Sequence, residues 1–220
     1  MIIERIGDHL ILIGTAHVFP ESIRIVRETI LREKPEIVGV ELCPQRYVAL
    51  SSGFRSVPTS PVVLVLYLIQ EFFSRRTGVE AGREMMEAIE AAREIGARVE
   101  FLDRDIGLTI RRLLALGLAE KLKFLGWLMM GFLFSPRVEL SELRKDDVLK
   151  LLHIFKRMCP GFYRVLVQER DEYMCSRILE LPAGRKAVCV IGAGHLPGVV
   201  HRLRKSWSLR LGWDMSFYSF

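Results

Sequence analysis

Four short runs of Val, Ile and Leu, each followed by a segment with helical periodicity, constrain the fold more than any other feature of this chain. They are His9–Ile13, Ile37–Val40, Val99–Leu102 and Ala187–Ile191. Strands that are apolar throughout are buried on both faces, and strands that alternate with helices are typical of parallel sheets. The sequence therefore predicts an α/β fold, with a mainly parallel sheet and helices on both of its faces.

The segments around these runs extend the prediction. Ile2–Ile6 is also strand-like, and Gly7-Asp8 after it is a hairpin signal, so we expect an antiparallel strand at one edge of the sheet. Apolar residues at helical spacing predict helices at Glu21–Lys34 and Glu80–Ile95.

The long segment Ile106–Leu181 has no strand pattern and contains helix breakers at Ser135-Pro136 and Pro160-Gly161. We interpret it as a helical insertion of three or four helices packed beside the sheet. Because no linker, repeat or low-complexity stretch interrupts the chain, residues 1–220 are expected to form one domain.

Composition excludes some classes of function. The chain has 220 residues, 50% of them hydrophobic and 26% charged, which is typical of a globular protein. Its net charge of +6 comes from basic residues interleaved with acidic ones on amphipathic helices, so no nucleic-acid partner is predicted. A basic cluster near the C-terminus leaves contact with anionic lipid or an acidic peptide open. It consists of His201, Arg202, Arg204, Lys205 and Arg210.

The two most apolar stretches are too short to cross a bilayer. Val62–Ile69 and Phe124–Phe134 fall below the roughly 20 residues that a spanning helix needs. We expect buried helices there, or faces for a partner or a membrane surface. Phe124–Met130 in particular is predicted to be buried in the helical layer or in a homodimer interface.

The four cysteines form no C-x-x-C pair, which favours reduced thiols and a cytoplasmic location.

Charged or metal-ligating residues follow every one of the four apolar runs. The segments are Gly14-Thr15-Ala16-His17, Glu41-Leu42-Cys43 with Arg46 after it, Asp103-Arg104-Asp105 and Gly192-Ala193-Gly194-His195. The carboxyl ends of parallel strands meet at one edge of a sheet, where ligands bind. The sequence therefore predicts a functional site at this edge.

Two histidines and a glutamate at three strand ends have the composition of a catalytic metal site. His17, Glu41 and His195 would hold one divalent ion, and mixed imidazole and carboxylate ligation suits zinc, manganese or cobalt. Such an ion lowers the pKa of its water and polarises a carbonyl, which points to hydrolysis. Gly14 and Gly192 lack a Cβ and would let each loop turn tightly.

The other residues of the edge have candidate roles in the same chemistry. Asp103, Asp105 or Glu41 would serve as the proton acceptor or orient an imidazole, and Arg46 or Arg104 would stabilise an oxyanion.

Simpler interpretations stay open. A single histidine at a strand end is commonly a hydrogen-bonded structural group, and Asp103-Arg104-Asp105 is also the composition of an internal salt-bridge cluster. Gly192-Ala193-Gly194 would suit a phosphate at a helix N-terminus, although the third glycine of a dinucleotide motif is missing. Cys43 is either a nucleophile beside His17 or an ordinary small residue.

Four motifs together resemble the TraB/PrgY pheromone-shutdown family. They are "GTAHVFPESIRIVRETILREKPEIVGVELCPQRYVAL", "FLDRDIGLTIRRLL", "QERDEYM" and "VIGAGHLPGVV", and they occur in that order over nearly the whole chain. The family is similar in turn to the Tiki metal-dependent proteases and to the erythromycin-esterase and ChaN-like groups, whose fold the resemblance implies.

The resemblance also implies functional residues. His17 and His195 match the two G-x-x-H histidines, and Glu41 matches the acidic partner. Further charged residues lie at motif positions and are expected to line the pocket, together with Gly14, Gly192 and Gly194. They are Arg46, Asp103, Arg104, Asp105, Glu169, Arg170 and Asp171.

The activity implied is that of a metal-dependent peptidase. The alternative is a non-catalytic peptide-binding module, a pheromone antagonist, in which Arg46, Arg104 and Arg170 clamp carboxylates.

This chain departs from the family pattern at Phe19, where serine is usual, and at Cys43, where aspartate is usual. Many relatives continue into hydrophobic C-terminal segments that anchor them in a membrane, whereas this chain stops soon after Gly198. We therefore expect the soluble module alone, cytoplasmic, with any membrane association coming from a C-terminal region absent from this chain.

Overall fold

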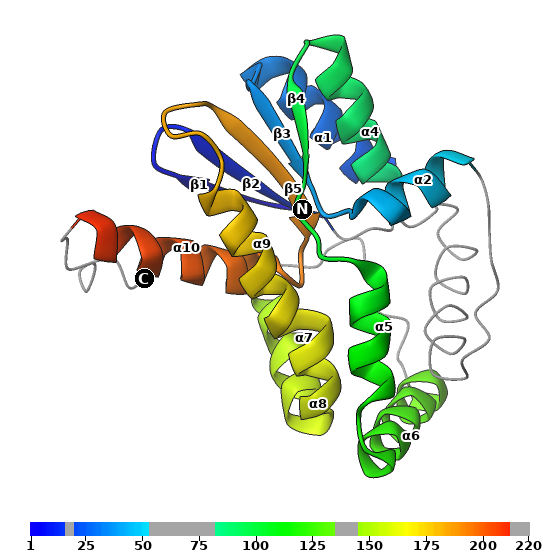
Figure 1. Cartoon of the computed structure of the whole chain (residues 1–220). Coiled ribbons are helices and arrows are strands. Elements are labelled where there is room, and N and C mark those ends of the chain that lie inside the picture. The colour runs from blue at the N-terminus through cyan, green and yellow to red at the C-terminus, as the bar shows by residue number, and fades with distance from the viewer. Residues whose placement is uncertain (16–19, 53–81, 135–144, 212–220) are drawn as a thin grey trace.

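The structure is a computed structural model that describes residues 1–15, 20–52, 82–134 and 145–211 (Figure 1). The apolar run Val62–Ile69, His17 and Phe19 lie outside the described residues.

A five-stranded sheet forms the centre of the fold, in the order β1-β2-β5-β3-β4. The strands are β1 (Ile2–Ile6), β2 (Leu10–Thr15), β3 (Ile37–Val40), β4 (Arg98–Phe101) and β5 (Ala187–Gly192). The β1–β2 pair is antiparallel, and the pairs β2–β5, β5–β3 and β3–β4 are parallel. The predicted α/β sheet with one antiparallel edge is confirmed, and the last strand of the sequence is inserted at its middle.

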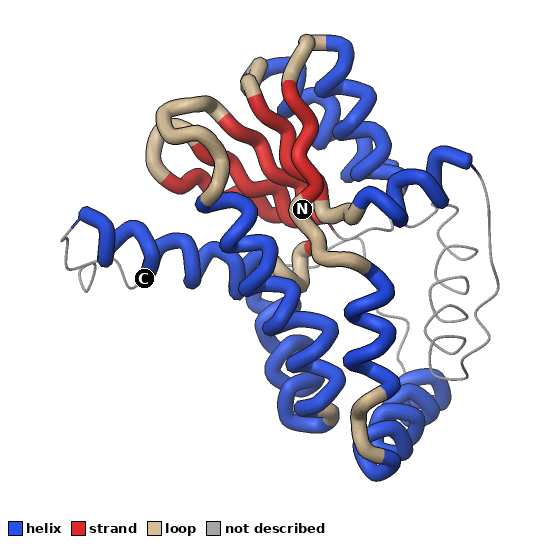
Figure 2. Tube along the Cα trace, viewed as in Figure 1, coloured by secondary structure: helices blue, strands red, loops and turns tan. Residues whose placement is uncertain are grey.

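Helices cover both faces of the sheet, as the apolar strands require (Figure 2). On one face, α1 (Pro20–Glu33) and α4 (Arg83–Glu94) pack through residues such as Ile30 and Ile89 onto Ile13 and Val190. On the other face, α9 (Glu169–Leu179) and α10 (Leu196–Leu211) pack onto the alternate strand residues, among them Leu12 and Ile191. The period of two in a strand divides its side chains between these two cores.

Close packing and backbone geometry limit two positions in this region. Gly96 ends α4 with a φ of +71°, a conformation that costs glycine little. A Cβ at Gly39 on β3 would lie 2.7 Å from Leu102 Cδ1 and 2.9 Å from Cys189 Sγ, so only glycine lets these neighbours pack so closely.

The predicted helical insertion extends away from the carboxyl edge of the sheet (Figure 1). Over Ile106–Leu181 the described residues form five α-helices, more than the three or four predicted: α5 (Ile106–Leu114), α6 (Leu118–Phe134), α7 (Lys145–Met158), α8 (Pro160–Tyr163) and α9, which packs on the sheet. A π-helical turn, Arg164–Gln168, joins α8 to α9. α8 begins at Pro160, where a break was predicted, whereas the predicted break at Ser135-Pro136 lies outside the described residues. A further break between α5 and α6, at Gly117, was not predicted.

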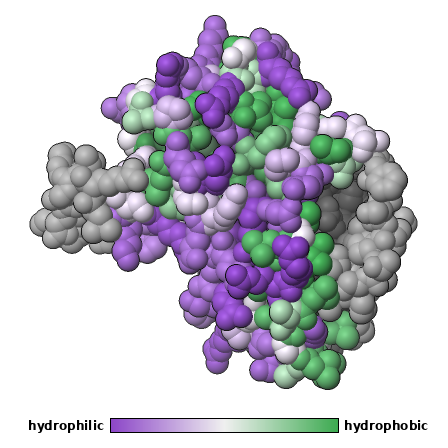
Figure 3. Space-filling view, in the orientation of Figure 1, coloured by the Kyte–Doolittle hydropathy of each residue, from purple (hydrophilic) through white to green (hydrophobic). Residues whose placement is uncertain are grey.

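A third, aromatic core holds the insertion together. The rings of Phe124 and Phe162 stack with centroids 3.9 Å apart, and Trp127 and Phe155 pack around them. Phe124 is therefore buried in the helical layer as predicted, while Leu125 beside it is 45% exposed. Apolar residues reach the surface near α5 and α6, at the lower right of Figure 3. Among the described helices, none has the length and apolarity needed to cross a membrane.

Candidate functional site

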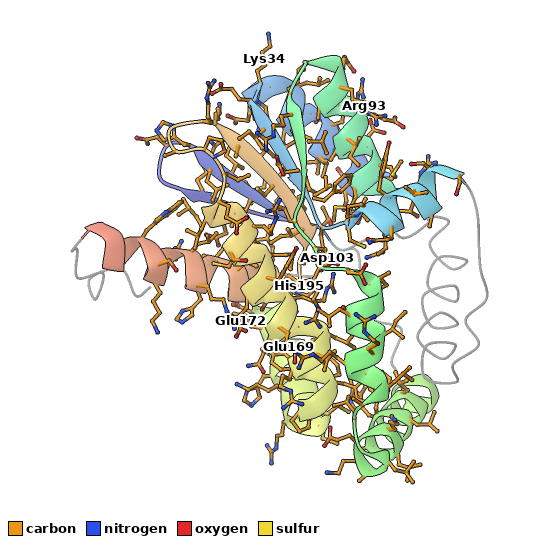
Figure 4. All side chains as sticks on the ribbon, in the orientation of Figure 1. Lys34, Arg93, Asp103, Glu169, Glu172 and His195 are labelled. Carbon is orange, nitrogen blue, oxygen red and sulfur yellow. The ribbon has the colours of Figure 1, made fainter. Side chains whose placement is uncertain are left out.

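The carboxyl edge of the sheet gathers three buried polar side chains that come directly after strands. Glu41 follows β3, Asp103 lies two residues after β4, and His195 comes three residues after β5. The first turn of α9 adds Arg170 and Asp171 from the opposite side. Figure 4 shows Asp103 and His195 near each other, where the sheet meets the helical insertion.

The imidazole of His195 is oriented by a buried carboxylate. Its Nδ1 lies 2.6 Å from Asp171 Oδ1. Because an ionised carboxylate can only accept, Nδ1 carries the hydrogen and Nε2 presents a lone pair. That lone pair faces Glu41 Oε1 at 3.4 Å and accepts from Arg170 Nη1 at 2.9 Å. Burial raises the pKa of Asp171, while its hydrogen bond with His195 opposes that rise.

A glycine on α10 makes room for this carboxylate. A Cβ at Gly198 would lie 1.9 Å from Asp171 Oδ2, so no larger residue fits without moving Asp171. The lack of a side chain at Gly198 therefore leaves the space in which Asp171 contacts His195.

Glu41 connects two strands at their ends. Its Oε2 accepts from the backbone N–H of Gly192 at 2.5 Å, and its Oε1 accepts from Arg170 Nη2. The carboxylate is 5% exposed. The hydrogen bond to Gly192 fixes Glu41 relative to β5, and so relative to His195.

Arg170 places a positive charge at the centre of the cluster. It holds Asp103 with two hydrogen bonds, Nε to Oδ1 at 3.0 Å and Nη2 to Oδ2 at 2.8 Å, besides its contacts with Glu41 and His195. Burial by itself would lower the pKa of Arg170, but the charges of Glu41 and Asp103 outweigh that effect and raise it. The guanidinium therefore stays charged.

Comparison of the sequence with known families agrees with the motifs. A sequence model of the TraB/PrgY/gumN family matches residues 71–206, more than half of the chain. The chain belongs to the TraB/PrgY/gumN family. The resemblance drawn from the motifs is thereby confirmed, and four residues of the cluster, Asp103, Arg170, Asp171 and His195, lie within the matched region.

Relatives in this family come from archaea and mammals. An uncharacterised protein of Methanocaldococcus jannaschii is 34% identical over 212 residues, which cover 88% of this chain and 53% of the relative. TraB domain-containing proteins of Bos taurus and Homo sapiens are 29% and 28% identical, each over 93% of this chain and 64% of the relative. The chain thus spans between about half and two thirds of the length of these relatives.

Several residues predicted for the TraB site make hydrogen bonds to other groups of the protein. Arg104 is buried and donates to Thr109 Oγ1 at 3.0 Å, Glu169 Oε2 at 2.7 Å and the Val165 carbonyl at 2.8 Å. These contacts hold the insertion to the sheet edge and use three of the five N–H groups of the guanidinium. Asp105 caps α5 through the Leu108 N–H at 3.1 Å.

The remaining predicted residues lie apart from the cluster or outside the description. Arg46 is half-buried on α2 (Pro44–Ser52) and takes no part in the hydrogen bonds of the cluster. Gly14 is needed by packing, since a Cβ there would lie 2.8 Å from Leu196 Cδ2. At Gly194 a Cβ would make only an ordinary contact, 3.8 Å from Leu152 Cδ2. His17 lies outside the described residues.

Sequence reasoning missed one further buried carboxylate. Glu84 in the first turn of α4 is 1% exposed, and its Oε1 accepts from Thr15 Oγ1 at 3.2 Å. Thr15 ends β2, so Glu84 joins the same edge of the sheet. A signal was present, because Glu84 occupies the apolar face of its helix, one turn before Ala88.

The described donors fit the divalent ion that the TraB resemblance implies. His195 Nε2 lies 3.4 Å from Glu41 Oε1, a distance that suits two ligands of one ion at about 2.1 Å each, and both atoms also contact Arg170. Within the described residues, no group of three or more His, Cys, Asp and Glu side chains forms a metal site. The cation that lies between the two donors is the guanidinium of Arg170.

Proposed function

We propose that this TraB-family chain is a metal-dependent hydrolase that cleaves peptides. The observation that carries the proposal is the pair of donors at the sheet edge, His195 Nε2 and Glu41 Oε1, which are 3.4 Å apart and both oriented by buried partners.

Each residue of the pair is oriented by a further hydrogen bond. Asp171 fixes the tautomer and the ring orientation of His195, as a carboxylate commonly does for a metal-binding imidazole. The N–H of Gly192 holds the carboxylate of Glu41 in place. A bound divalent ion such as zinc, manganese or cobalt would lower the pKa of water and polarise a substrate carbonyl.

The surrounding residues narrow the choice of proton acceptor. Both oxygens of Asp103 accept from Arg170, and Oδ1 also accepts from the N–H of Arg104 at 2.9 Å. Asp103 therefore holds Arg170 in place. Of the three carboxylates predicted as proton acceptors, Glu41 is the one that lies against His195.

The peptide as substrate class rests on the resemblance to the pheromone-shutdown family and the Tiki proteases. The non-catalytic alternative needs Arg46, Arg104 and Arg170 free to clamp peptide carboxylates. Arg104 and Arg170 instead donate to acceptors within the protein, which counts against the clamp.

The test combines metal analysis with an activity assay. Protein purified without chelator is analysed for bound metals and then incubated with a mixed peptide library. We expect cleavage that a chelator abolishes, a loss of at least about 1,000-fold in His195→Ala and Glu41→Gln, and a loss of about 10- to 100-fold in Asp171→Asn.

Glu172→Gln is the matched control for Asp171→Asn, because Glu172 is the neighbouring residue on α9 and is 66% exposed. It should cleave at the wild-type rate. A wild-type protein that holds no metal and cleaves nothing rules out the hydrolase. Peptide binding that is unaffected by chelation, without product, would establish the binding module in its place.

A further inference from the structure

We infer that Arg170 is a resident cation of this site, which competes with the divalent ion for His195 and Glu41 and so sets the affinity for metal. This inference rests on the proposed function, because it assumes that the metal binds at that pair.

The contacts of Arg170 carry the inference. Its Nη1 uses the Nε2 lone pair of His195, and its Nη2 uses Oε1 of Glu41, the two atoms that face each other at 3.4 Å. A lone pair that accepts an N–H cannot at the same time ligate an ion. A divalent ion beside an unmoved guanidinium would also meet strong like-charge repulsion at low local dielectric.

Asp103 holds the same guanidinium, because it accepts from Nε and Nη2 of Arg170 in a two-point contact. Such bidentate pairs are strong and directional. Since Nη2 also donates to Glu41, the contact with Asp103 keeps Arg170 against the two metal donors, and a divalent ion has to displace the guanidinium from them.

The experiment is a metal titration of the whole chain by calorimetry, after chelator treatment and dialysis. Zinc and manganese are the probes. Arg170→Gln removes the competing charge and should bind at least about tenfold more tightly than the wild type, with Arg170→Lys in between because one ammonium cannot make all the contacts of a guanidinium.

Two controls make the result specific. Arg177→Gln changes another arginine of α9, one that pairs with Glu180 and Glu100, and should bind metal as the wild type does. The double variant Arg170→Gln/His195→Ala should lose the gain in metal affinity, because it lacks the imidazole of His195.

Arg170→Gln leaves buried carboxylates without their cation, so its folding is followed by circular dichroism. Folding that depends on added zinc supports the inference. Equal or weaker binding by both Arg170 variants overturns it, as does tight binding that survives the loss of His195. The proposed hydrolase is overturned by a different result, a wild type that cleaves no peptide. If the wild type cleaves peptides but Arg170→Gln binds metal no more tightly, only the inferred competition by Arg170 is overturned.

Discussion

The same kind of ion pair occurs in two very different parts of this protein. At the sheet edge, Arg170 Nη2 lies 2.8 Å from Asp103 Oδ2, with side chains 14% and 4% exposed. On α1, Arg24 Nη1 lies 2.7 Å from Glu28 Oε1, with side chains 62% and 52% exposed. The distances are nearly equal, so the difference between the two pairs lies in their surroundings.

That difference shows where charge serves stability and where it serves a site. Buried charges lose their hydration, and their attraction repays this loss only when every partner is in place. The edge cluster joins β3, β4, α9 and the start of α10, whereas the Arg24 pair stays within one helix. The buried charges at the sheet edge thus coincide with the candidate site, whereas the exposed pair on α1 lies apart from it.

The largest expected effect comes from breaking the buried network at Arg104. Arg104→Met removes the hydrogen bonds to Glu169 Oε2 and to the Val165 carbonyl, and leaves Glu169 with the exposed Arg164 at 3.8 Å. We expect a loss of about 3–5 kcal/mol in the free energy of unfolding, measured by urea denaturation. Arg24→Met is the exposed control and should leave the urea midpoint unchanged. Equal changes in the urea midpoint for Arg104→Met and Arg24→Met would contradict the distinction between the buried cluster and the exposed pair.

A smaller effect is expected from a methyl group at the edge. Gly198→Ala places a Cβ against Asp171 and should cost about 1–3 kcal/mol of stability. On α6, a Cβ at Gly126 would have nothing within 4 Å, so Gly126→Ala should stabilise by about 0.5–1 kcal/mol through helix propensity. We expect the midpoint of thermal unfolding to fall in Gly198→Ala and to rise in Gly126→Ala. A rise in both variants would show that Asp171 can move away from the added methyl group.

The smallest effect concerns an ion pair near the opposite end of the strands. Hydrogen bonds from Arg5 and Lys186 lower the pKa of Glu33 from 4.5 to about 2. A depressed pKa contributes stability above pH 4.5 that is lost as the pH falls towards 2. The difference in urea midpoint between wild type and Glu33→Gln should therefore shrink over this window. A difference that does not change with pH would mean that the pair contributes no charge-dependent stability.

The sequence predicted the sheet well because its signals are local. Runs such as Ile37–Val40 are apolar on both faces, and Gly7-Asp8 joins two strands that lie side by side in the chain, so five strands and their directions followed from short segments. The same signals brought Glu41, Asp103 and His195 to one edge. The pairing of His195 with Asp171 and the roles of Gly198 and Glu84 were not predicted, since a helical pattern tells which face a residue occupies but not which side chain it meets.

What the sequence determined by itself is the fold class, the family, and the edge of the sheet where the candidate functional residues collect. Each of these follows from periodicity or from motifs within a few dozen residues. Only the tertiary structure decided that Arg104 fastens the insertion, that Asp103 binds Arg170, and that a guanidinium lies between His195 and Glu41. Those contacts join residues 25 to 129 positions apart, and their geometry is set by how helices and strands pack.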